Sequence, residues 1–112
     1  MTKVIINKTR DGEYLGFTCS GHAGHAQAAN TDRDVVCAAV SVLVINTLNA
    51  LDAFTEVKMQ VEADEKDGLI QCRFERSLEE KAKVLVDAMV LGLSDISKEY
   101  GSRFCKLKFE EV

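Results

Sequence analysis

The chain has 112 residues, a net charge of −4 at neutral pH, and a composition that is 46% hydrophobic and 29% charged. This length and composition predict one folded domain spanning residues 1–112 and exclude an extended disordered chain. The negative charge lacks the basic footprint of nucleic-acid binding. No secretory leader is recognisable, and the four cysteines lack the density of a secreted disulfide framework, so we expect a cytoplasmic protein.

The chain opens with the pattern of a β-hairpin. Residues 3–9 are β-branched and apolar, Asp11 and Gly12 mark a turn, and residues 14–20 alternate between two faces. The alternation places one set of side chains of the second strand toward the core: Leu15, Phe17 and Cys19.

Residues 21–33 are small or polar without periodicity, and connections of this length are usually functional or mobile.

Asp34 is a suitable N-cap for a helix over residues 35–51. That run is short of the ~20 apolar residues of a membrane span and contains polar side chains. It is also apolar on nearly all sides, so we expect it either at the centre of the domain or against a second subunit. We favour a homodimer.

The second half repeats the pattern. Residues 57–63 and 69–75 alternate around a polar turn, and residues 78–100 have helical periodicity after a Ser77–Glu80 capping box. Residues 103–110 alternate again. The order ββαββαβ predicts an α+β fold, with two helices packed on one mixed or antiparallel sheet.

Cys37 is the candidate nucleophile. If Asp34 caps the helix, Cys37 lies in its first turn, where unpaired N–H groups and the helix dipole favour a thiolate and bind an oxyanion. His22 follows the second strand directly, between Gly21 and Gly24, and could serve as its base. The remaining cysteines fall on inward strand positions and are expected in the core: Cys19, Cys72 and Cys105.

Other interpretations of these residues stay open. Cys37 can be a small buried hydrophobe, and Ser41 can bond its hydroxyl to the carbonyl of Cys37. A zinc site is the main chemical alternative, although its spacing is not that of a standard finger or ribbon. Its ligands would be Cys19, His22, His25 and Cys37.

The segments GHAG, residues 21–24, and DVVCAAVS, residues 34–41, together resemble the ribosomal-processing cysteine protease family Prp. The likeness covers the whole chain, including its length, its element order and the apolar helix after the cysteine. Its segment between His22 and Cys37 has 14 residues, a few more than the family pattern.

This resemblance implies a cytoplasmic cysteine endopeptidase without a cofactor. Such an enzyme removes the N-terminal extension of a large-subunit ribosomal protein and works as a homodimer that binds neither nucleic acid nor membrane. It matches Cys37 to the nucleophile, His22 to the general base and acid, and Asp34 and Ser41 to supporting motif positions. The substrate loop would include Gly21, Gly24 and His25. A non-catalytic ribosome-assembly factor is the further alternative.

Overall fold

Seven elements follow one another in the order that the sequence predicts. The computed structural model describes residues 2–21, 31–64, 66 and 68–112, and only the backbone of residues 31–34. The elements are β1 (Thr2–Lys8), β2 (Tyr14–Ser20), α1 (Thr31–Phe54), β3 (Met59–Asp64), β4 (Leu69–Phe74), α2 (Glu80–Tyr100) and β5 (Cys105–Glu111).

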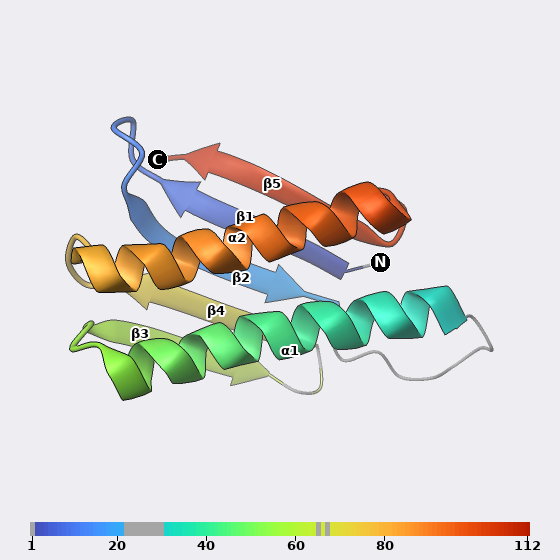
Figure 1. The fold of residues 1–112 in the computed structure, drawn as a ribbon, viewed down its shortest axis with the longest axis horizontal. Helices are drawn as coiled ribbons and strands as arrows, with labels where there is room; N and C mark the ends of the chain where they lie inside the picture. Colours follow the sequence, from blue (N-terminus) through green and yellow to red (C-terminus); the bar gives the residue numbers. More distant parts are fainter. Residues whose placement is uncertain (1, 22–30, 65, 67) are drawn as a thin grey trace.

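The strands form one five-stranded mixed sheet in the order β3-β4-β2-β1-β5. β1 pairs with β5 in parallel, whereas the β1–β2, β2–β4 and β3–β4 pairs are antiparallel. Figure 1 shows α1 and α2 running side by side over one face of this sheet. The prediction of a single α+β domain with two helices on a mixed sheet is therefore confirmed.

The core lies between the helices and the sheet face that they cover. In a strand every second residue faces the core, and in a helix every third or fourth residue does. The side chains at these positions in the strands pack against those at the corresponding positions in the two helices. The fully buried members with the largest side chains include Val4, Ile6, Phe17, Val36, Val40, Val44, Leu51, Val86, Met89 and Leu93.

Helix α1 differs from its prediction in position and in burial. It begins at Thr31, so Asp34 is its fourth residue and the predicted N-cap role of Asp34 is wrong. One face of α1 is buried in the core, but on the opposite face Val42 is 68% exposed and Val35 is 51% exposed. The alternative of a helix buried at the centre of the domain is therefore wrong. By length and composition alone, Val35–Phe54 could also cross a membrane.

Strand β2 has the predicted limits, but its first two residues lie on the opposite faces of the sheet from those predicted. A register shift between Asn7 and Lys8 of β1 brings Tyr14 to the helix side of the sheet, where Tyr14 is 6% exposed. Its hydroxyl donates a 2.5 Å hydrogen bond to Asp87 of α2. Phe17 and Cys19 are buried as predicted, whereas Leu15 is only partly buried because the shift changes the alternation.

The start of α2 also departs from the sequence pattern. The helix begins at Glu80, its N-cap Glu79 has no side-chain capping bond, and the Ser77 hydroxyl instead donates to Glu13 at 3.1 Å. The predicted capping box is therefore wrong, because its serine has a partner elsewhere in the fold. The predicted end is confirmed: the N–H of Gly101 donates to the carbonyl of Ser97.

The hydrogen bond from Tyr14 to Asp87 joins α2 to the sheet, and it generates a stability prediction. Burial and the neighbouring Asp87 carboxylate raise the pKa of Tyr14, so the phenol stays protonated and donates. We expect Tyr14→Phe to lower the free energy of unfolding by about 1 kcal/mol, the usual value of one such bond. Urea denaturation measures this, with Tyr100→Phe as the control. An unchanged midpoint for Tyr14→Phe would show that the bond contributes nothing.

Candidate active site

The candidate site lies where β2 ends against α1. The Cys37 thiol donates a hydrogen bond to the backbone carbonyl of Gly21, with 3.5 Å between sulfur and oxygen. Gly21 follows the last residue of β2 and has φ of +77°, a conformation that favours glycine. The chain thus turns at Gly21, and its carbonyl reaches the candidate nucleophile. Sequence patterns carry no signal for such a backbone acceptor, which the prediction missed.

Cys37 is the seventh residue of α1, not the third as predicted. The backbone N–H of the seventh residue of an α-helix donates to the carbonyl four residues earlier. The helix dipole stabilises negative charge mainly within the first turn. The predicted oxyanion role for the Cys37 N–H is therefore wrong. The backbone N–H groups without an intrahelical partner belong to the first four residues of α1.

The environments of the four thiols are different. Cys37 is 4% exposed, while Cys19 and Cys105 are fully buried, as the prediction of core cysteines required. Burial, with smaller contributions from Cys37 and Cys105, raises the pKa of Cys19 to about 12. Burial likewise raises the pKa of Cys72 to about 12 and raises that of Cys105. These three thiols therefore stay protonated at neutral pH.

The structure locates only part of the remaining predicted site. Ser41 lies one turn after Cys37 and is partly buried, and Asp34 lies one turn before it with only its backbone described. The predicted base His22 and the loop residues Gly24 and His25 lie outside the described residues. The pairing of Cys37 with a histidine therefore stays a prediction.

The zinc alternative also depends on both histidines. Within residues 2–21, 31–64, 66 and 68–112, no group of three or more His, Cys, Asp and Glu side chains could hold a metal ion. Of the four proposed ligands, the described pair is Cys19, which is fully buried in the core, and Cys37.

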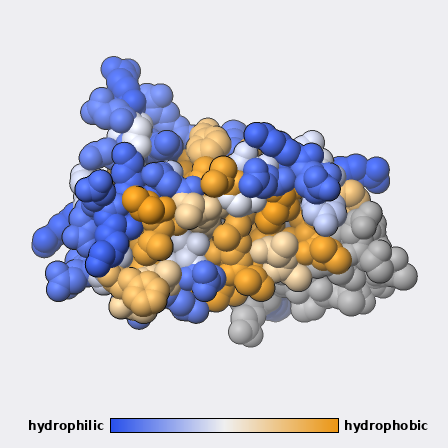
Figure 2. Space-filling view, viewed as in Figure 1, coloured by the Kyte–Doolittle hydropathy of each residue, from blue (hydrophilic) through white to orange (hydrophobic). Residues whose placement is uncertain are grey.

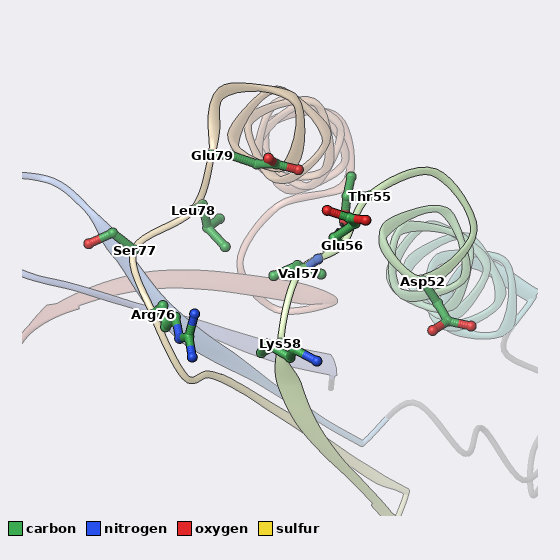
Figure 3. A pocket seen from close by; sticks show the side chains of 9 residues that line it. All are labelled: Asp52, Thr55, Glu56, Val57, Lys58, Arg76, Ser77, Leu78 and Glu79. Atoms are coloured by element: carbon green, nitrogen blue, oxygen red, sulfur yellow. Dashed lines mark hydrogen bonds between the residues drawn. The ribbon is translucent and has the colours of Figure 1, made fainter.

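A cavity of about 670 Å³ lies at the opposite end of the helices from Cys37. Figure 3 shows its lining, which comes from the end of α1 and from the segments before β3 and α2. Its charged side chains carry both signs and include neither a cysteine nor a histidine. Despite its size, this cavity is therefore a weaker candidate for the active site than the surroundings of Cys37, because it has no side chain that could act as a cysteine nucleophile or a histidine base.

A model of the cysteine protease Prp family matches residues 1–104 of the chain. The chain belongs to the cysteine protease Prp family. This confirms the resemblance seen in the sequence, and with it the prediction of an enzyme that hydrolyses peptides with a cysteine nucleophile.

Three relatives illustrate the match. The ribosomal processing cysteine protease Prp of Bacillus subtilis is 28% identical over 104 residues, which cover 89% of this chain and 90% of the relative. The S. aureus Prp solved with a covalently linked product peptide has a TM-score of 0.85 and 24% identity, covering 98% and 100% of the two chains. A Streptococcus mutans structure also has a TM-score of 0.85, with 25% identity and 100% and 99% coverage.

The contrast between the thiols predicts selective alkylation. At pH 8 and under native conditions, we expect limiting iodoacetamide to modify Cys37 and leave the other three cysteines unmodified. A pKa raised to about 12 for Cys19 and Cys72, and a raised pKa for Cys105, keep these three thiols protonated and slow to react. Peptide mapping by mass spectrometry identifies the modified residue. Equal labelling of Cys72 and Cys37 would contradict the assignment.

Proposed function

We propose that this Prp family member removes an N-terminal extension from a large-subunit ribosomal protein, with Cys37 as its nucleophile. The observation that carries the assignment is the place of Cys37. Its sulfur lies 3.5 Å from the Gly21 carbonyl, at the end of the strand that leads directly to His22. The substrate is supported by the name of the B. subtilis relative, a ribosomal processing protease.

The proposed reaction begins from a protonated thiol. The S–H bond of Cys37 donates to Gly21, so the proton must move before the sulfur can attack. In the proposal, the His22 imidazole accepts this proton, and the thiolate adds to the scissile carbonyl to form a tetrahedral intermediate. Collapse of the intermediate breaks the C–N bond, and His22 gives its proton to the leaving amine.

A thioester on Cys37 then holds the extension. His22 accepts a proton from water as the hydroxide adds to the thioester carbonyl. The C–S bond then breaks, the sulfur takes that proton back from His22, and the carboxylic product is released. The S. aureus relative solved with a covalently linked product peptide supports a covalent step of this kind. We place the reaction in the cytoplasm, where ribosomal proteins are processed and where Cys37 stays reduced.

The proposal predicts that two substitutions abolish cleavage. Incubation of the purified protein with a ribosomal protein bearing its extension should give a shorter product with a new N-terminus. Cys37→Ala and His22→Ala should each lower the cleavage rate at least about a hundredfold, since general base catalysis contributes about 10²–10⁴-fold. Electrophoresis and N-terminal sequencing measure the product.

Cys72→Ala is the matched control for Cys37→Ala, and it should leave cleavage within a few-fold of the starting protein. Retained cleavage by Cys37→Ala would overturn the nucleophile assignment. Binding of the extended protein without any product would favour the assembly-factor alternative. About one zinc per chain in the native protein, lost with His25→Ala, would favour the metal alternative.

We further propose that the outer face of the two helices forms a homodimer interface. An apolar groove of about 650 Å³ runs between α1 and α2, and Val42 in its wall is 68% exposed. Figure 2 shows hydrophobic surface over both helices on this side of the molecule. A continuous apolar patch of this kind is typical of protein–protein interfaces. The groove is lined by Ala38, Ala39, Val42, Leu43, Asn46, Gly92 and Ile96.

Placing a charge in this groove should separate the subunits. We expect Val42→Lys to convert a dimer at micromolar concentration into a monomer, because it would bury an unpaired ammonium group. Sedimentation velocity measures the change, and Val112→Lys, at a valine that is 77% exposed, is the control. A starting protein that sediments as a monomer would contradict the dimer.

A further inference from the structure

Thr2 is a buried polar residue whose hydroxyl the fold does not use. It is the first residue of β1 and is 2% exposed. Its backbone N–H donates to the carbonyl of Phe104, but its hydroxyl makes no hydrogen bond within the part of the chain that the structure describes. The other buried polar residue described, Thr47, donates its hydroxyl to the Leu43 carbonyl at 2.8 Å. A hydroxyl in so buried a residue is costly without a partner, so it needs an explanation.

The register of the sheet places Thr2 beside the Cys37 site. In the antiparallel pair of β1 and β2, Lys3 is opposite Ser20, so the preceding residue Thr2 is opposite Gly21. Opposite residues of such a pair have Cα atoms about 4.5–5.5 Å apart. The Gly21 carbonyl in turn lies 3.5 Å from the Cys37 sulfur. Thr2 is therefore the cross-strand neighbour of the residue that contacts the sulfur.

The side chain of Thr2 lies on the face of the sheet that the helices cover. Thr2 alternates in β1 with the fully buried Val4 and Ile6, and it pairs with the fully buried Cys105 of β5. Cα atoms of α1 and β1 come within 8 Å of each other, and Figure 1 shows both elements beginning at the same end of the molecule. Thr2 and Cys37 thus project into the same buried layer, one from the sheet and one from the helix.

The proposed reaction requires a hydrogen-bond donor in this layer. In the resting protein the Cys37 S–H donates to the Gly21 carbonyl. Once His22 has taken the proton, the negative sulfur lies against the partly negative carbonyl oxygen, and the same contact becomes repulsive. The backbone N–H of Cys37 is used within α1, because Cys37 is the seventh residue of the helix. The Thr2 hydroxyl can donate instead, since its hydrogen rotates freely about the C–O bond.

We propose that the Thr2 hydroxyl donates a hydrogen bond to the Cys37 sulfur when the sulfur is a thiolate, and so stabilises the nucleophile. Thr2 keeps its own proton, and the thiol proton goes to the base. The unused hydroxyl of the resting fold is then a donor that is used only while the charge is present. The inference rests on the proposed function, in which Cys37 is the nucleophile, and it adds a residue to that site.

The titratable groups around this layer do not replace the hydroxyl. Cys19 of β2 and Cys105 of β5 face the layer from the sheet, and burial raises the pKa of both thiols, which are weak donors. Cys37 also contributes to the raised pKa of Cys19, in agreement with its place above this end of β2. Asp34 lies one turn before Cys37 in α1 with only its backbone described, and His22 lies outside the described residues. The charged residues in the last turn of α2 are exposed, namely Lys98 and Glu99.

The test follows the rate at which iodoacetamide alkylates Cys37 as a function of pH, with peptide mapping to isolate this cysteine. Thr2→Val keeps the β-branched shape of threonine and removes only the hydroxyl. We expect the midpoint of its rate–pH curve to rise by about one pH unit, as for the loss of one hydrogen bond to a charged group. At a pH below both midpoints, the rate should fall about tenfold, and at a pH above both midpoints the rates should converge.

Two matched variants and a stability measurement separate this role from a structural one. Thr2→Ser retains the hydroxyl and should keep the midpoint of the unmodified protein. Thr47→Val makes the same exchange at a threonine that is 5% exposed and lies about 15 Å further along α1, and it should not move the midpoint. In urea denaturation, Thr2→Val should be at least as stable as the unmodified protein, because it removes a buried hydroxyl without a partner.

Cleavage of the extended ribosomal protein separates the inference from the proposed function. If Thr2→Val lowers kcat/KM in proportion to the alkylation rate at the same pH, both are supported. If the unmodified protein cleaves nothing, the proposed function fails, and the alkylation curves still decide whether the hydrogen bond forms. An unchanged midpoint in Thr2→Val, or an equal shift in Thr47→Val, overturns the inference. A loss of stability in Thr2→Val with a midpoint that Thr2→Ser does not restore shows a structural role and also overturns it.

Discussion

The contact between the Cys37 sulfur and the Gly21 carbonyl joins the two elements on which the candidate site depends. Gly21 directly follows β2, the middle strand of the sheet, and Cys37 lies on the buried side of a helix whose valines fill the core. Cys37 is held by the packing of α1, and Gly21 directly follows the paired strand β2. The Cys37 sulfur is held next to the Gly21 carbonyl, and its proton must be transferred to a base before the sulfur can react.

The same packing explains how one cysteine differs from three others. Cys19, Cys72 and Cys105 point from the sheet into the core, where burial opposes a charged thiolate. Cys37 enters the same layer from the helix side and near its end, next to the turn at Gly21. This difference in position within the fold distinguishes Cys37, the proposed nucleophile, from the other three thiols.

The alternation of apolar and polar residues predicted most of the sheet, because it indicates on which face of a strand each side chain lies. It located β2 from Tyr14 to Ser20 and predicted alternating strands where β3 and β4 lie. It could not predict that Val61 would stay 44% exposed, because burial depends on how the helices pack over the sheet. The register shift between Asn7 and Lys8, which brings Tyr14 to the side of Asp87, has no local signal either.

The errors in the helix starts have a similar cause. Threonine, asparagine and aspartate all cap helices well, so Asp34 was one of several equivalent choices, and α1 continues back to Thr31. Ser77 has the right spacing for a capping box, but its hydroxyl bonds to Glu13 across the fold. For the site, the sequence patterns identified Cys37 and its family likeness, while the Gly21 acceptor required the three-dimensional structure.

In the proposed mechanism, Cys37 carries the acyl group of the substrate during turnover. Mixing enzyme with excess peptide, quenching with acid within a turnover and weighing the intact protein tests it directly, because thioesters survive at low pH. We expect a mass increase equal to the N-terminal fragment of the peptide, located on Cys37 by digestion and absent in Cys37→Ala. The same adduct on Cys19, Cys72 or Cys105, or cleavage that proceeds in Cys37→Ala, would contradict it.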